Sequence, residues 1–138
     1  MRYIPQAHAG CSAARNRGIA ETTAPYILLL DSDDRLDACC LAELAAALDG
    51  RPEARLAYGD FDEFGEGSIE GTYFERCPPA DGMIGAKVLK QFTLTAICSV
   101  MFRRSGLATV GLLDERMGMA DAEDVEFCCL VHLAGLNF

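Results

Sequence analysis

The stretch YILLLDSDDRLD, Tyr26–Asp37, joins a run of apolar residues directly to a cluster of acids. Ile27–Leu30 are expected to be buried, whereas the carboxylates of Asp31, Asp33 and Asp34 repel one another and favour water, a cation or both. The apolar run is too short for a helix and is typical of a strand that is covered on both faces. The acids alone leave two interpretations open: a solvated turn whose final aspartate caps the next helix, or a metal site.

Around this stretch the pattern alternates between helices and strands. Residues 10–24 predict a helix, and residues 37–48 predict the clearest helix of the chain. Five residues of that second helix share one apolar face, namely Cys40, Leu41, Leu44, Ala45 and Leu48. Residues 55–61 are the next strand candidate. This order predicts an α/β fold with a mainly parallel sheet flanked by helices.

The rest of the chain carries weaker patterns. The expected elements are a short extended piece at 2–6, a short strand at 71–75, a helix at 82–92, a β-rich run at 95–104, a short helix or turn at 105–111 and a helix at 121–134. A chain of 138 residues without a clear linker fits one domain.

Composition excludes several classes of protein. The net charge of −9 argues against a nucleic-acid surface, because phosphate binding needs an excess of Lys and Arg. No apolar run approaches the roughly 20 residues of a membrane span, and no signal-peptide pattern is present. The adjacent pairs Cys39–Cys40 and Cys128–Cys129 are interpreted as small buried residues in a reducing compartment. The expected location is the cytoplasm, with peripheral contact at the inner membrane face as a further option.

The acids lie at the carboxyl end of the predicted strand. Ligands of open parallel sheets bind beyond the carboxyl ends of the strands. Oxygen ligands without a neighbouring His or Cys favour Mg²⁺ or Mn²⁺ over zinc, and such ions are usually shared with a substrate diphosphate. The predicted cofactor is therefore Mg²⁺ or Mn²⁺.

Two longer segments carry a resemblance to a known family. AGCSAARNRGIAETTAPYILLLDSDDRLDACCLAEL, residues 9–44, resembles family 2 glycosyltransferases of GT-A fold, whose pattern is a glycine, an ARN.G helix, an apolar strand, DSDD and a helix. SVMFRRSGLATVGLLDERMGMADAEDVEFCCLVHLAG, residues 99–135, resembles the FRR, G.FDE and ED segments of the same family. The resemblance covers nearly the whole chain and is weak between Asp62 and Thr95.

The resemblance implies a reaction and a donor site. The family transfers a sugar from a nucleoside diphosphate sugar to an acceptor, usually with inversion. By resemblance, Arg15, Asp31 and Asp33 belong to the nucleotide-sugar site, and Asp33 with Asp34 belongs to the metal site. On its own sequence context, Arg15 is equally well an exposed helix arginine.

Glu123 and Asp124 form the second acid pair. The resemblance implies that they start a helix near the acceptor, an unknown glycan, lipid or small molecule. Asp124 would serve as the general base that takes the proton of the acceptor hydroxyl, with Glu123 beside it. Acids in a first helical turn are also common for stability alone, so the residues by themselves leave both roles open.

The chain also departs from the family pattern. It begins at what resembles the third strand and ends before the usual final strand, so we expect a partial catalytic domain over residues 1–138. An open sheet edge beside residues 26–30 would favour self-association. The alternative is a non-catalytic remnant of the fold that acts as a binding or interaction module. A phosphohydrolase lacks support, since no phosphate loop of the GxxxxGK[ST] type is present.

Overall fold

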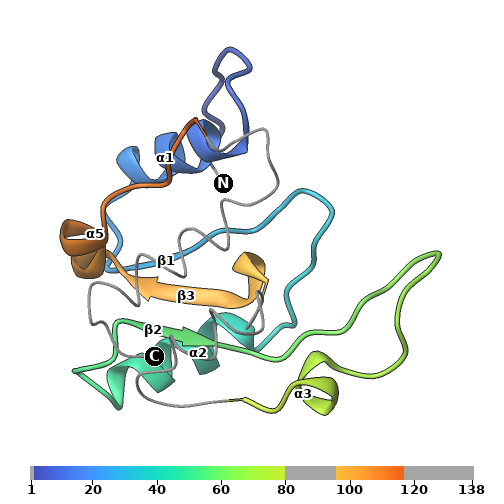
Figure 1. Cartoon of the computed structure of the whole chain (residues 1–138). Coiled ribbons are helices and arrows are strands. Elements are labelled where there is room, and N and C mark those ends of the chain that lie inside the picture. Colours follow the sequence, from blue (N-terminus) through green and yellow to red (C-terminus); the bar gives the residue numbers. More distant parts are fainter. Residues whose placement is uncertain (1, 80–95, 117–138) are drawn as a thin grey trace.

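The computed structural model describes residues 2–79 and 96–116 of the chain. Within them a three-stranded sheet forms the centre, in the order β1–β3–β2. Strand β1 spans Tyr26–Leu28, β2 spans Leu56–Tyr58 and β3 spans Val100–Arg103 (Figure 1). The strands predicted at 26–30, 55–61 and 95–104 are confirmed in shorter form. The helices expected at 82–92 and 121–134 lie outside the described residues.

Strand β3 runs antiparallel to both of its neighbours. Phe102 lies opposite Ile27 of β1 on one side and opposite Leu56 of β2 on the other. Strands β1 and β2 therefore point in the same direction, as the strand–helix–strand order predicted, but a later segment of opposite direction lies between them. The prediction of a mainly parallel sheet was wrong for this reason. The helical connection between β1 and β2 fixes their relative direction but not whether they are neighbours in the sheet. The predicted α/β class therefore holds, whereas the predicted parallel pairing does not.

Helices cover both faces of the sheet. The core on one face includes side chains of α1 (Cys11–Ala20) and α5 (Arg104–Val110), and the core on the other includes side chains of α2 (Cys40–Asp49) (Figure 1). The buried residues on the α1 face are Ile19, Ile27, Leu29, Leu56, Ile97, Val100, Phe102 and Leu113. Those on the α2 face are Leu44, Leu48, Ala54 and Met101. Residues alternate between these cores along each strand, as the period of two requires.

Helix α2 begins at Cys40 rather than at Asp37. The carboxylate of Asp37 accepts a hydrogen bond from the backbone N–H of Cys39 at 3.0 Å, which holds the chain in a turn before the helix. Cys39 is consequently exposed, and its interpretation as a buried residue was wrong, while Cys40 is half-buried. Leu48 is fully buried, but Leu41 is 51% exposed, so the apolar face is narrower than the sequence predicted.

The adjacent arginines of the FRR motif each close a different helix. Arg103 donates from Nε to the carbonyl of Ala54 at 2.9 Å and from Nη2 to the carbonyl of Leu48 near the end of α2. Arg104 donates to the carbonyl of Ile19 in the last turn of α1 at 3.0 Å, and to the carbonyl of Ala24 in the segment after the helix at 2.7 Å. Carbonyls at a helix end lack intrahelical partners, so the two guanidinium groups stabilise both helix ends.

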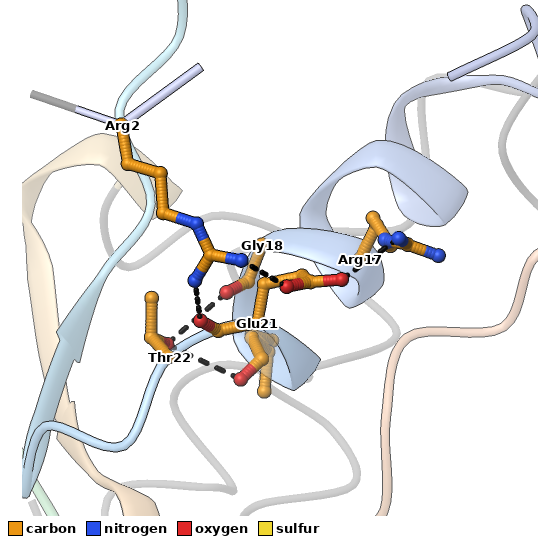
Figure 2. Close-up of polar contacts among 6 residues, drawn as sticks. Arg2, Arg17, Gly18, Glu21 and Thr22 are labelled. Carbon is orange, nitrogen blue, oxygen red and sulfur yellow. Dashed lines mark hydrogen bonds and ion pairs between the residues drawn. The ribbon is translucent and has the colours of Figure 1, made fainter. Parts of the chain in front are cut away.

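The end of α1 carries further polar contacts, which Figure 2 shows. The hydroxyl of Thr22 donates to the carbonyl of Gly18 at 3.1 Å. Arg2 donates to the carbonyl of Glu21 at 2.7 Å and pairs with its carboxylate, which Arg17 also contacts at 2.7 Å from one helical turn away. The N-terminal segment is thereby tied to the same helix end that Arg104 closes.

The strand predicted at 71–75 was wrong. Residues Tyr73–Arg76 form the short helix α3, and only an isolated bridge joins Thr72 to Asp62. The carboxylate of Glu75 accepts from the backbone N–H of Thr72 at 2.9 Å, which is the Thr-x-x-Glu pattern of a helix start. Among the described residues, no helix is long and apolar enough to cross a membrane.

Candidate functional site

The predicted acids form a tight turn after β1. The backbone N–H of Asp34 donates to the carbonyl of Asp31 at 3.3 Å, which closes a turn that contains Asp33. Asp33 is exposed, whereas Asp31 and Asp34 are half-buried. The acids therefore lie at the carboxyl end of β1, as the sequence predicted.

Arg15 of α1 pairs with the first of these acids. Its Nη2 lies 2.9 Å from Oδ1 and 3.0 Å from Oδ2 of Asp31. The Arg15 side chain is only 11% exposed, so the exposed-arginine alternative is wrong. This ion pair neutralises Asp31 and directs its carboxylate toward α1, so the negative charge beyond β1 rests on Asp33 and Asp34.

These acids face a hollow of about 510 Å³, which we call the acidic hollow. Its carboxylates come from the turn after β1 and from the loop after β2, namely Asp31, Asp33, Asp34, Asp62, Glu63 and Glu66. None of the described residues that line it is Lys or Arg. A second hollow of about 680 Å³ adjoins it and shares Asp34 and the rings of Phe61 and Phe64. The guanidinium of Arg35 stacks on Phe64 at 5.1 Å from the ring centre.

Asp34 has a partner that the sequence did not indicate. The thiol of Cys98, from the 3₁₀ turn Ile97–Ser99, hydrogen-bonds to the Asp34 carboxylate. Burial and this carboxylate raise the pKa of Cys98 to about 12. The thiol therefore stays protonated at neutral pH and can donate a hydrogen bond to Asp34. In this form it does not compete with Asp34 as an anionic metal ligand.

The acids fit a divalent cation only together with a ligand that carries oxygens of its own. In the described part of the chain, no three His, Cys, Asp or Glu side chains converge as a complete protein metal site requires. Asp33 and Asp34 offer the hard oxygen atoms that Mg²⁺ and Mn²⁺ prefer. Mg²⁺ is usually held by one or two carboxylates plus substrate phosphates, so this donor set matches a shared site.

Asn16 is a residue to which the sequence assigned no role. It is buried in α1, and its Oδ1 accepts from the backbone N–H of Leu113 at 3.1 Å. Its Nδ2 donates to the carbonyl of Leu113 at 2.9 Å and to the carboxylate of Glu115 at 3.0 Å. Asn16 thus joins the ARN segment of α1 to the GLLDE segment, residues 111–115. Leu113 lies 97 residues after Asn16 in the chain. The available signal was its position in the ARN segment of the family pattern.

The GLLDE segment forms an irregular turn after α5. Leu113, which stands where the family usually has an aromatic residue, is buried in the core on the α1 face. Hydrogen bonds from the guanidinium and backbone N–H of Arg116 lower the pKa of Asp114 to about 2. Asp124, the predicted general base, and the neighbouring Glu123 lie outside the described residues.

Comparison with known proteins identifies relatives of this chain. Residues 1–111 match the model of the family described as Glycosyl transferase family 2. A segment of the chain is also 37% identical over 62 residues to an uncharacterized protein, y4gI, of Sinorhizobium fredii. The match covers 45% of this chain and only 7% of that relative, so the chain spans a small part of its length.

Proposed function

Because the chain belongs to glycosyltransferase family 2, we propose that it binds a nucleoside diphosphate sugar in the acidic hollow and transfers the sugar to an acceptor hydroxyl, with inversion. The observation that carries this proposal is the position of Asp33 and Asp34 at the carboxyl end of β1, beside the Arg15–Asp31 pair. In this arrangement the Arg15–Asp31 pair lies toward the nucleoside, and Asp33 and Asp34 lie toward the diphosphate.

The charge of the hollow supports a metal-assisted reaction. Carboxylates without a neighbouring cation repel a diphosphate, and no described residue that lines the hollow is Lys or Arg. Asp33 and Asp34 would hold Mg²⁺ or Mn²⁺. When bound, such an ion stabilises the negative charge that develops on the departing nucleoside diphosphate. Asp31 stays paired with Arg15 and orients the donor side of the site.

The test is a titration of Mn²⁺ with and without UDP or GDP. We expect weak binding of Mn²⁺ alone, and binding at least about tenfold tighter with the diphosphate, since the ion then gains phosphate oxygens. Asp33→Ala/Asp34→Ala should abolish that gain. Glu53→Ala/Glu70→Ala removes the same charge from exposed positions that do not line the hollow, and should retain it. Equal behaviour of the wild type and Asp33→Ala/Asp34→Ala would overturn the proposal.

Asp124 is the proposed general base, with Glu123 in a supporting role. Asp124→Asn should lower kcat by about 10²-fold or more with little change in donor binding, because general-base catalysis is typically worth that much. Glu123→Gln should cost less. A fully active Asp124→Asn enzyme would instead favour a helix-capping role. Measuring transfer with a panel of glycan, lipid and small-molecule acceptors would also identify the acceptor class.

The free edge of β1 supports a further expectation. In the described residues β1 pairs with β3 on one side only, and an unpaired strand edge favours association between chains. We therefore propose that the chain self-associates. Sedimentation would check this, and a monodisperse monomer would contradict it. A chain that binds Mn²⁺ and diphosphate without transferring sugar would match the alternative, a binding module.

A further inference from the structure

Two successive residues of α1 contact two segments that lie far apart in the chain. Arg15 contacts Asp31 beyond β1, and Asn16 contacts Leu113 and Glu115 in the turn after α5. Neighbouring residues of a helix lie about 100° apart around its axis, so one helix can hold both contacts at once. A shift of α1 would consequently move both.

The Asn16 contacts fix the orientation of its amide. The N–H of Leu113 needs an acceptor, whereas its carbonyl and the Glu115 carboxylate need donors, so only one assignment of Oδ1 and Nδ2 satisfies all three. Asn16 is 6% exposed and Leu113 is 4% exposed. Water cannot easily replace these bonds, so loss of the amide leaves buried backbone groups unpaired.

We infer that Asn16 is a positioning residue, which holds the Leu113–Glu115 turn in fixed register with the Arg15–Asp31 pair. The inference rests on the proposed function, because it makes α1 the link between the donor side of the site and the Leu113–Glu115 turn. Asn16 itself does not line the acidic hollow. Its effect is therefore indirect, through the place that it gives to the turn.

The variants separate positioning from stability. Asn16→Ala removes all three hydrogen bonds. Asn16→Asp keeps an acceptor for the Leu113 N–H but turns the two donated bonds into repulsive contacts, and Glu115→Gln should relieve one of these. Gly18→Ala lies in the same helix with nothing within 4 Å of the added carbon, so it should raise stability without touching the turn. Adding it to each Asn16 variant compensates for general loss of stability.

The first measurement is amide hydrogen exchange in the wild type and in Asn16→Ala/Gly18→Ala, where the stability gained at position 18 offsets part of the stability lost at position 16. The Leu113 amide should exchange about tenfold faster or more when Asn16 is absent, while the Ile27 and Phe102 amides of the sheet keep their rates. Asn16→Asp should also loosen the turn, and Glu115→Gln should restore part of the protection. Unchanged Leu113 exchange, or equal acceleration in the sheet, would overturn the inference.

The second measurement tests the register. Asp31→Asn weakens the pair with Arg15, and it should speed Leu113 exchange when Asn16 is present but not in Asn16→Ala. Mn²⁺ with UDP should slow Leu113 exchange in the wild type and not in Asn16→Ala, and by reciprocity the variant should bind Mn²⁺ with UDP more weakly. Additive effects of Asp31→Asn and Asn16→Ala would overturn the inference. If Mn²⁺ with UDP does not bind at all, the proposed function fails, while the ligand-free cycle still decides the role of Asn16.

Discussion

Helices α1 and α2 each contain ten residues and contribute to the cores on opposite faces of one sheet, but they bury different chemistry. Helix α2 buries Leu44 and Leu48, an ordinary apolar pair one turn apart. Helix α1 buries Ser12, Asn16 and Ile19, of which two are polar. The apolar pair of α2 needs only an apolar surface to pack on. The buried polar residues of α1 need specific hydrogen-bond partners.

This difference indicates that the two helices have different roles: α2 supports the sheet, and α1 positions residues of the candidate site. Helix α2 stabilises the sheet through packing that many apolar residues could provide. Helix α1 instead forms directed contacts: Arg15 to Asp31, and Asn16 to the turn after α5. Such contacts specify positions more than they add stability, because buried polar groups gain little net free energy from pairing but lose much when unpaired. The predictions below test this division of roles.

The largest expected effect is on the α2 side. Leu48→Ala should lower the free energy of unfolding by about 2–5 kcal/mol, because it removes a fully buried side chain and leaves a cavity. Leu41→Ala, on the exposed side of the same helix, should change it by less than about 0.5 kcal/mol. Urea denaturation of both variants measures the difference. Similar losses would show that the packing of α2 does not depend on its buried pair.

The next effect concerns the two arginines that close the helices. Arg104→Ala and Arg103→Ala should each cost about 1–3 kcal/mol, since each removes two hydrogen bonds from a charged donor to backbone carbonyls. Lysine at either position should restore only part of the lost stability, because one ammonium group cannot donate in the two directions that a guanidinium group can.

Arg17→Ala is the matched control for that pair. Its guanidinium is exposed and pairs with Glu21 from one turn away, so its loss should cost no more than about 0.5 kcal/mol. Thermal unfolding followed by circular dichroism would compare the three variants. Equal costs at all three arginines would mean that Arg103 and Arg104 act by surface charge and not as helix closures.

The fold could be predicted where short-range patterns decide it. The periodicity of α2 and the apolar run of β1 were sufficient to find both elements. The insertion of β3 between β1 and β2 could not be found in this way, because strand adjacency depends on contacts between segments far apart in the chain. Helix α3 was missed although Thr72 and Glu75 carried its start signal, since the aromatic residues between them favour a strand by composition.

The candidate site likewise has features that could be predicted from the sequence and features that could not. The acids after β1 were found because carboxylates beside an apolar run are unusual, and the family pattern drew attention to Arg15. The ion pair of Arg15 with Asp31, the Cys98 thiol at Asp34 and the role of Asn16 depend on tertiary contacts. Spacing in the sequence holds no information about which of these side chains meet.

A smaller effect, of opposite sign, is expected at Ser12. Its hydroxyl is fully buried and has no hydrogen-bond partner in the described structure. Ser12→Ala should therefore stabilise the protein by about 0.5–1 kcal/mol, through better helix propensity and relief of an unpaired polar group. Ser105→Ala changes the same second helical position in α5, where the side chain is exposed and accepts a long hydrogen bond of 3.5 Å from Arg55, and it approximates the propensity contribution. Destabilisation by Ser12→Ala would reveal a partner for the hydroxyl, and with it a further directed contact of α1.

The smallest effect belongs to the turn that Asn16 holds, and it depends on pH. The hydrogen bonds of Arg116 lower the pKa of Asp114 to about 2, whereas an unfolded aspartate titrates near 3.9. The ionised group therefore contributes stability above pH about 4, and this contribution is lost as the pH falls through about 2. Because the Arg116 side chain is 90% exposed, water screens the pair and the contribution is slight. Asp114→Asn should lower the melting temperature a little at pH 7 and by progressively less as the pH falls toward and below about 2. A difference that stayed constant over this range would show that the turn depends on Asn16 alone and gains nothing from its own ion pair.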